Sequence, residues 1–307
     1  MTTFQQRGNA LTGSLGLEKV EQACLDAMQG IFGHLDFTPE ADSTIHRFHV
    51  PGDRTGSQNA WYILFGDTPA SWAFGSWKTG ETFTGTGRQP VDPAEAALLK
   101  ARIDQAKHKR KIDQARRHQA AVRAAQRLWA KGRPADPDHP YLRRKRVHAK
   151  NLRQIDDVLL VPMYSDGALV NIQRIDAEGS KKFLFGGQVT GAYYALGSIE
   201  QGCCLIVCEG WATGATLNLH AGHPVACAMN SGNLKPVALA LKKRYPSVRL
   251  LIAGDDDRQT DGNPGRTAAM AAAVATRAEV SFPEWPEGAP LELSDFNDLH
   301  VWSADHE

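Results

Sequence analysis

Acidic residues directly follow two short apolar runs, and this pattern indicates chemistry. The run CLIVC ends at Glu209, and the run LLIAG ends at Asp255, Asp256 and Asp257. Side chains alternate along an extended segment, so Asp255 and Asp257 are expected on one side and Asp256 on the other. Carboxylate oxygens are hard ligands that suit Mg2+. The spacing therefore predicts a divalent-cation site that includes Glu209, Asp255 and Asp257.

A second acidic pair, Asp295 and Asp298, lies in the segment LSDFNDLH near the end of the sequence. Several carboxylates gathered in one place would repel one another without a cation, and such clusters often mark function. A single acid at a strand end is usually a solvated turn or a helix cap. Two strand ends that carry acids at this spacing in one sheet favour a metal site over that interpretation.

The elements that must position these acids follow an α/β pattern. VLLVPMYS (158–165) and ALVNIQRID (168–176) have the composition of strands, and Asp166-Gly167 is a turn between them. Further on, apolar strands alternate with amphipathic helices, which indicates a mainly parallel sheet flanked by helices. Ligands of such sheets bind where the strands end at their carboxyl edge. Glu209 and the triplet that begins at Asp255 come from two such strand ends.

The first 90 residues have a different character. Residues 17–31 have helical spacing, and residues 45–85 contain short β-forming runs separated by Gly, Pro or Asp. Trp61, Trp72 and Trp77 lie within these runs. Large aromatic residues usually form a core, and base-stacking on exposed rings is the alternative.

A long helix is predicted from Pro93 to about Lys131, with Asp92 as its N-cap. Residues 91–150 hold 17 basic and 6 acidic residues, a net charge of +11, although the whole chain of 307 residues has a net charge of +1. The basic residues form either a solvated helix face or a surface that follows phosphates. The Pro-rich segment 132–140 then predicts a break between domains.

The cysteines and the apolar runs exclude several classes of protein. The five cysteines include no CxxC pair, so no structural zinc site is expected. Buried thiols in a reducing cytoplasm are the predicted alternative. No apolar run approaches the roughly 18 residues that span a membrane, and the first residues lack a secretory pattern. We therefore expect a cytoplasmic protein without a membrane partner.

Three acidic segments, LIVCEGWATGATL, LIAGDDD and SDFNDL, together resemble a Toprim domain, the catalytic fold of bacterial-type primases, some topoisomerases and some nucleases. The preceding stretch 158–197 resembles the basic subdomain of bacterial-type DNA primases, with Gln173-Arg174, Lys182-Phe183-Leu184 and a Tyr-x-Leu-Gly segment that starts at Tyr194. HPYLRRKRV (139–147) is similar to stretches of plasmid- and phage-encoded primases in particular.

The resemblance implies four parts along the chain. These are a small β-rich module without zinc ligands, a basic helical connector, a primase-like basic α+β subdomain and a Toprim catalytic domain, at residues 1–90, 91–138, 139–200 and 201–307. Bacterial primases usually carry an N-terminal zinc ribbon. Here no cysteine lies between Cys24 and Cys203, so a zinc-independent module is expected.

The resemblance also implies roles for single residues. Glu209 would act as acid/base or would position a metal, Asp255 and Asp257 would bind Mg2+ or Mn2+, and Asp295 or Asp298 would supply a further ligand. Contacts to nucleic acid or nucleotide would come from Arg143, Arg144, Lys145, Arg174, Lys181, Lys182, Asn230, Ser231 and Asn233. From the residues alone, Lys181-Lys182 could equally be an exposed turn, and Asn230, Ser231 and Asn233 a helix cap.

The implied activity is that of a DNA primase, which makes short primers on a single-stranded DNA template from nucleoside triphosphates by metal-dependent nucleotidyl transfer. No GxxxxGK[ST] motif is present, so a replicative helicase or single-strand-binding protein is expected as a separate partner. Two alternatives stay open: a Toprim-type nuclease, and a non-catalytic single-strand-binding protein of a mobile element.

Overall fold

The computed structural model describes residues 6–53, 55–67, 70–76, 81–87 and 93–306. The chain divides into two compact units, residues 1–114 and 115–307, and each is described by itself. The division falls within helix α2 (Pro93–Lys131), which has the bounds that the sequence predicts. The domain limits expected at residues 90, 138 and 200 stay predictions.

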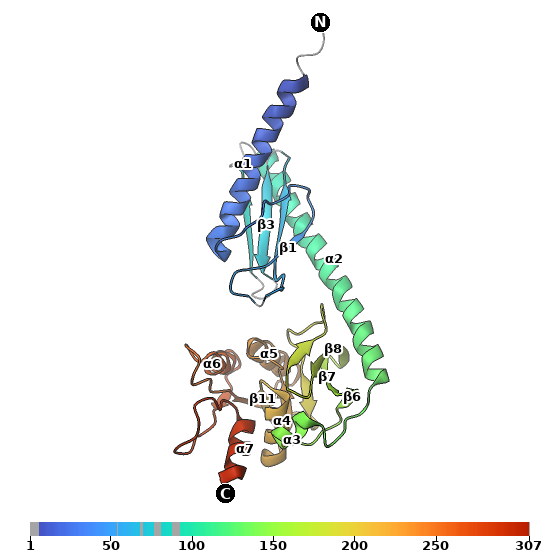
Figure 1. Ribbon diagram of the computed structural model, residues 1–307, viewed down its shortest axis with the longest axis vertical. Helices are drawn as coiled ribbons and strands as arrows, with labels where there is room; N and C mark the ends of the chain where they lie inside the picture. Colours follow the sequence, from blue (N-terminus) through green and yellow to red (C-terminus); the bar gives the residue numbers. More distant parts are fainter. Residues whose placement is uncertain (1–5, 54, 68–69, 77–80, 88–92, 307) are drawn as a thin grey trace. The chain divides into compact units, whose positions relative to one another are not determined.

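The first unit contains helix α1 (Gln6–Phe32) and an antiparallel sheet in the order β1-β2-β3-β4. The strands are β1 (His46–Phe48), β2 (Ala60–Phe65), β3 (Ser71–Ser76) and β4 (Thr82–Thr86). Helix α1 lies against this sheet (Figure 1), and its Cys24 and Met28, both 0% exposed, pack on aromatic residues of the strands.

The aromatic residues of this unit form its core. Trp61 is 1% exposed and Trp72 is 6% exposed, and they belong to apolar clusters on opposite faces of the sheet. Rings covered in this way offer no surface to a nucleobase, which favours the core interpretation over base stacking. Trp77 and Asp92 lie outside the described residues.

The second unit begins with an antiparallel sheet in the order β5-β6-β7-β8-β9, which we call the hairpin sheet. Its strands are β5 (Arg133–Pro134), β6 (Arg153–Ile155), β7 (Val158–Ser165), β8 (Ala168–Ile175) and β9 (Lys181–Phe183). Asp166 and Gly167 both have positive φ, 49° and 82°, which suits the two-residue turn of a tight hairpin. The short helix α3 (Pro140–Lys145) lies between β5 and β6 in the chain.

The other sheet of this unit, the central sheet, has the order β10-β12-β11-β13-β14. Its strands are β10 (Tyr194–Leu196), β11 (Cys204–Cys208), β12 (Val225–Cys227), β13 (Arg249–Ala253) and β14 (Glu279–Ser281). All neighbouring pairs are parallel except β10 with β12. The mainly parallel sheet predicted from the sequence is therefore confirmed.

Helices cover both faces of the central sheet. Helices α5 (Leu234–Arg244) and α6 (Pro264–Thr276) share one apolar cluster with β11 and β13, and α4 (Trp211–Ala221) packs in the cluster on the other face. Figure 1 shows α5 and α6 beside each other. Helix α7 (Phe296–His306) packs against α4, and the 3-10 turn η1 (Ser231–Asn233) precedes α5.

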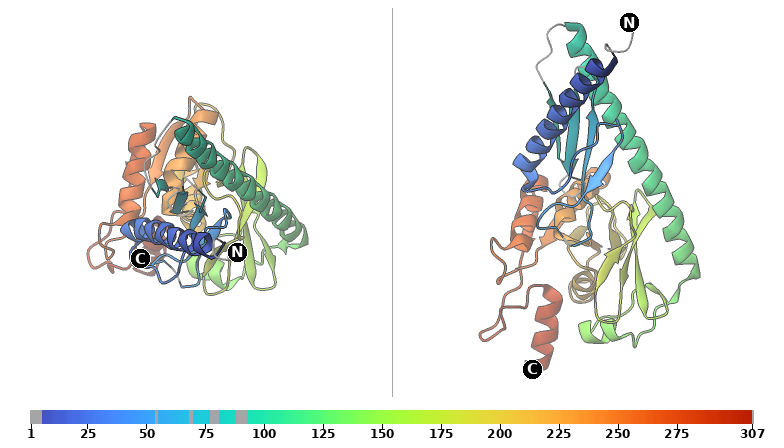
Figure 2. Two further views of the ribbon diagram at one scale, coloured as in Figure 1. Left: turned by 90° about the horizontal axis from the view of Figure 1, so that it is seen from above. Right: turned by 45° about the horizontal axis from the view of Figure 1, so that its top comes forward.

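The hairpin sheet lies between two other parts of its unit. One face lies beside helix α2 (Figure 2). On this face Leu160 and Ile172 pack against Ala125 of the helix. On the other face Leu159 and Ile175 join the cluster that includes α4. The two faces of this sheet therefore point toward different surroundings, which decides where its charged residues lie. Within the part of the chain that the structure describes, no helix is long and apolar enough to cross a lipid bilayer.

Candidate functional site

The acidic residues predicted from the strand ends leave the central sheet at the same edge. Strands β11 and β13 are parallel neighbours, and Cys208 is paired in register with Ala253. Glu209 follows the first strand directly, and Asp255 follows the second after Gly254. Parallel strands in this register deliver both carboxylates to the carboxyl edge of the sheet, where ligands of such folds bind.

Asp255 has the most perturbed environment of these acids. Burial, followed by the charges of Glu209, Asp295 and Asp257, raises the pKa of Asp255 to about 8, and Lys181 acts in the opposite direction. Its Oδ1 atom is buried without a hydrogen-bond partner. A buried carboxylate oxygen without a donor is costly unless something else compensates it.

Glu209 is subject to the same group of charges. Burial raises the pKa of Glu209, and Asp257 and Asp295 raise it further. Lys181 and the backbone N–H of Ser231 lower it. The structure therefore brings Glu209, Asp255, Asp257 and Asp295 together with one cation, Lys181, as a single electrostatic group.

Asp256, the middle aspartate of the triplet, points away from Asp255 and Asp257, as strand alternation predicts. Asp257 Oδ2 accepts the backbone N–H of Gly265 at 2.8 Å, at the start of α6. Asp256 is 8% exposed and bonds instead to Asn263, Arg266 and Trp285. Partial burial acts to raise the pKa of Asp256, but those hydrogen bonds outweigh it and lower the pKa.

Asp295 and Asp298 have different surroundings. Asp295 Oδ1 accepts the backbone N–H groups of Asn297 and Asp298 at 2.7 and 2.9 Å, so it caps α7 while its charge also acts on Glu209 and Asp255. Asp298 forms an ion pair with Lys145 at 2.8 Å and accepts the N–H of Ser294 at 3.1 Å. Asp295 thus acts as a helix cap, and the charge of Asp298 is paired with Lys145.

The three basic residues of β8 and β9 separate onto two faces of the hairpin sheet. Lys181 is paired with Ile175, so it lies on the face toward the acids. Arg174 is paired with both Leu160 and Lys182, so Arg174 and Lys182 lie together on the face toward α2. All three basic side chains are exposed. Only Lys181 acts on the charges of Glu209 and Asp255.

The turn that follows β12 positions Glu209. Asn230 is the N-cap of η1 and accepts the N–H of Asn233 at 3.0 Å. Asn233 is 2% exposed, and its amide bonds to Gly191 N–H and to the carbonyls of Ala192 and Ala228. The side chain of Asn233 is thus committed to packing, and Ser231 reaches Glu209 through its backbone. The helix-cap alternative accounts for Asn230.

The basic residues of α3 have mostly intramolecular contacts. Lys145 bonds to Asp298, and Arg144 donates to the carbonyl of Ala177 at 3.1 Å. Arg143 is exposed. The charge of Lys145 is therefore balanced within the protein, which leaves Arg143 as the residue of this group that is best placed to meet an outside phosphate.

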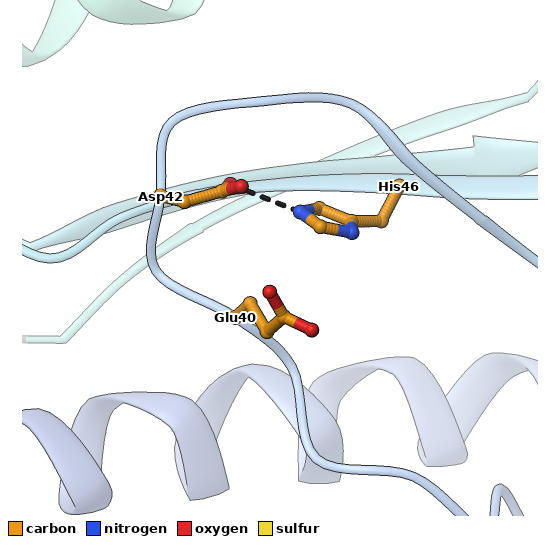
Figure 3. A group of neighbouring side chains, drawn as sticks. All are labelled: Glu40, Asp42 and His46. Atoms are coloured by element: carbon orange, nitrogen blue, oxygen red, sulfur yellow. Dashed lines mark hydrogen bonds and ion pairs between the residues drawn. The ribbon is translucent and has the colours of Figure 1, made fainter.

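A separate group of potential metal ligands lies in the first unit and was not predicted from the sequence. The donor atoms of Glu40, Asp42 and His46 all lie within 4.8 Å of one another (Figure 3), and among the described residues no group at the acidic edge meets this criterion. His46 Nε2 is 2.9 Å from Asp42 Oδ1, and Thr44 bonds to both side chains. Asp42 and His46 therefore satisfy each other without an ion.

The residues at the acidic edge nevertheless fit a divalent cation. Asp255 Oδ1 is buried without a donor, and three further carboxylates lie around it. A cation would supply the missing partner and would offset both the burial and the repulsion that raise the pKa of Asp255. Thiols and imidazoles are not part of this group, so its ligands suit Mg2+ or Mn2+ better than zinc.

Comparison with known proteins finds a matching domain family and two related proteins. Residues 204–304 match the Toprim domain. A DNA primase TraC of Escherichia coli is 33% identical over 270 residues, which cover 83% of this chain and 25% of that protein. A second DNA primase TraC of the same species is 29% identical over 279 residues, 87% of this chain and 19% of that protein.

This chain therefore spans about a quarter or less of the length of these relatives. The primase fragment of the bacteriophage T7 primase-helicase protein aligns with a TM-score of 0.39 and 19% identity, covering 57% of this chain and 72% of that one. So low a TM-score adds no argument to the sequence match. The carboxylates that converge at the edge of the central sheet thus belong to a Toprim domain, in a chain related in sequence to the DNA primases TraC.

Proposed function

We propose that this chain is a DNA primase that makes short primers on single-stranded DNA from nucleoside triphosphates. The observation that carries the proposal is the group formed by Glu209, Asp255, Asp257 and Asp295, because Asp255 in this group has a buried oxygen without a donor. The sequence match to the TraC primases over 83% of the chain supports it.

The carboxylates of Asp255 and Asp257, with Glu209 and Asp295 beside them, would hold Mg2+ or Mn2+. When bound, such a cation stabilises the negative charge that develops on the attacking and leaving oxygens. Asp298 is a weaker candidate ligand because its charge is paired with that of Lys145. The proposed reaction uses no zinc, and it uses no cation at the group formed by Glu40, Asp42 and His46.

Two residues of the protein would then act directly on the substrates. A primer 3′-hydroxyl, or that of the first nucleotide, forms a bond to the α-phosphorus of the incoming nucleotide as the bond to pyrophosphate breaks. Glu209 is placed to accept the hydroxyl proton, since its carboxylate lies at the same edge as those of Asp255 and Asp257. Lys181 is the cation on the same side and would hold the triphosphate.

A direct assay separates this function from the two alternatives. The protein is incubated with circular single-stranded DNA, labelled nucleoside triphosphates and Mg2+ or Mn2+, and the products are resolved on a gel. We expect short new oligonucleotides that Glu209→Gln abolishes and that Asp261→Asn, an exposed control in a nearby turn, leaves unchanged. Cleavage of the template would indicate a nuclease, and binding without either product would indicate a non-catalytic protein.

The template surface is proposed on the other face of the hairpin sheet. Arg174 and Lys182 are direct cross-strand neighbours, and like charges in that position repel each other unless an anion lies between them. The helix that packs on this face carries further exposed basic residues, Arg123 and Lys131 among them. We therefore place template phosphates here, with Arg143 as a further candidate, and the nucleotide at Lys181.

Replacing both Arg174 and Lys182 by Ala should weaken binding to single-stranded DNA and make it less dependent on salt. Each lost phosphate contact lowers the slope of log K against log salt by about 0.7, so the double variant should lose roughly 1.4. Fluorescence anisotropy with a labelled oligonucleotide over a salt series measures this. Lys181→Ala should keep the wild-type slope and raise the KM for nucleotide, and equal slopes in all three proteins would contradict the assignment.

The remaining partners are proposals of the same kind. A separate replicative helicase or single-strand-binding protein would supply the single-stranded template, and the reaction would take place in the cytoplasm, where such templates and nucleotides occur. Cross-linking of the protein to its partners on replicating DNA in cells would test both.

A further inference from the structure

Asp256 has no part in the proposed reaction, yet it has more polar contacts than the acids on either side. It is 8% exposed and sits between Asp255 and Asp257, with its side chain directed away from them. A buried carboxylate needs charged or hydrogen-bonding partners to compensate for its lost hydration. The identity of those partners shows what Asp256 connects.

The carboxylate of Asp256 joins two segments that are far apart in sequence. Its Oδ1 accepts hydrogen bonds from Asn263 Nδ2 at 2.8 Å and from Arg266 Nη1 at 3.0 Å, both at the start of α6. Its Oδ2 accepts one from Trp285 Nε1 at 3.3 Å. Trp285 belongs to the segment that leads from β14 to α7, so one side chain holds the first turn of α6 and this segment together.

The backbone N–H of Asp256 and the side chain of Arg258 also hold this segment. The N–H of Asp256 donates to the carbonyl of Ser294 at 2.7 Å. Arg258 donates to the carbonyls of Pro290 and Leu293 at 2.6 and 3.2 Å, and its guanidinium lies 4.4 Å from the ring centre of Trp285. These contacts clamp residues 285–294, which form neither helix nor strand.

The clamped segment ends directly at Asp295, one of the four acids of the site. Its course from Trp285 to Ser294 lacks the backbone bonds of a helix or sheet, so its position depends on the contacts with Asp256 and Arg258 and, at its end, on the Ser294 N–H that donates to Asp298. The next anchor along the chain is the buried Asn297, which donates to the carbonyl of Lys145 and to Thr216 Oγ1. Asp295 is therefore held between two anchors, and Asp256 is the centre of the first.

We infer that Asp256 is a positioning residue, which sets the place of Asp295 relative to Asp255 and Asp257 by clamping segment 285–294 to the start of α6. The inference rests on the proposed function, because it concerns the same cation site. A purely structural role would lower stability alone. The ion pair with Arg266 contributes little stability, since the Arg266 side chain is 50% exposed and exposed pairs are weak.

The test measures binding of Mn2+ to the metal-free protein by electron paramagnetic resonance, without any catalysis. Asp256→Asn keeps the shape of the side chain and removes its charge, and we expect the Kd for Mn2+ to rise about 10- to 100-fold, as for other residues that orient metal ligands. Trp285→Phe removes the contact to Oδ2 and should raise the Kd less. Asp261→Asn, in the same turn and exposed, is the matched control and should bind as the wild type does.

Two outcomes overturn different claims. If the wild type binds Mn2+, Asp255→Asn does not, and Asp256→Asn binds with the wild-type Kd, the positioning role is wrong and the proposed cation site stands. If the wild type binds no Mn2+, or if Asp255→Asn binds Mn2+ as tightly as the wild type does, the proposed cation site itself is wrong. Should Asp256→Asn fail to fold, Trp285→Phe and Arg266→Gln decide, and wild-type affinity in both would overturn the inference.

Discussion

Replacing Asp255 by Asn is expected to abolish primer synthesis and at the same time to make the metal-free protein more stable at pH 8. The loss of activity should be roughly 100- to 1,000-fold or more, as for other groups that stabilise charge in a transition state. The gain in stability follows from the raised pKa of Asp255, about 8 against an ordinary value of 3.8. A residue retained at the cost of stability is typical of a functional site.

The direction of the pH dependence follows from proton uptake. Between about pH 4 and pH 8 the folded wild type keeps the Asp255 proton that the unfolded chain has lost, so stability falls as the pH rises. Asn does not titrate, so the advantage of Asp255→Asn should be absent near pH 3, grow between pH 4 and 8, and then level off. Each pKa unit corresponds to about 1.4 kcal/mol, which makes the gain on the order of several kcal/mol at pH 8.

Urea denaturation of both proteins over a pH series, with a chelator present, measures this difference. Added Mg2+ should narrow the difference, because a ligand that binds only the folded state stabilises it by about 2.7 kcal/mol at 100 times its Kd, and Asp255→Asn would lose this gain. Asp261→Asn should follow the wild type throughout. A variant that is no more stable than the wild type at pH 8 would show that burial and the neighbouring charges do not raise the pKa of Asp255.

The second large effect is expected at Gly214 in α4. A Cβ atom there would overlap Cys227 Sγ and lie 3.1 Å from Cys208 Sγ and 3.4 Å from Leu196 Cδ1. Overpacking of this kind costs about 1 to 3 kcal/mol, so Gly214→Ala should destabilise the second unit by that amount. Because α4 begins two residues after Glu209, its displacement should also reduce primer synthesis.

Two further variants make this prediction specific. Gly30→Ala is the matched control, since Gly30 lies in helix α1 with nothing within 4 Å of its would-be Cβ, and Ala is favoured over Gly in a helix by about 1 kcal/mol. Cys227→Ala removes the overlapping sulfur, so in a double-mutant cycle it should rescue Gly214→Ala by about 1 kcal/mol. Strictly additive changes in the free energy of unfolding would show that the helix accommodates the methyl group.

Local patterns determined the order of the elements and the main acids of the site. Apolar runs that end in Glu209 and Asp255 predicted strand ends at one sheet edge, because parallel strands deliver their carboxyl ends together. Alternation along the chain also predicted that Asp256 would point away from Asp255 and Asp257, and its bonds to Asn263 and Arg266 agree. The strands, the helices and the side on which each acid lies can be predicted because side chains repeat every two residues along a strand and every 3.6 residues along a helix, and both periods are visible in the sequence.

The pairing of distant charges depended on the tertiary structure. Lys181 and Lys182 are adjacent in sequence, but they lie on opposite faces of the hairpin sheet. The register of β8 and β9, together with the elements packed on each face, places Lys181 on the face toward the acids and Lys182 on the face toward α2. The sequence predicts Asp295 or Asp298 as a further metal ligand, and only the tertiary structure shows that Lys145, 153 residues away, pairs with Asp298. A contact between residues far apart in sequence has no periodic signal, because it is decided by which surfaces pack together and which charges are buried between them.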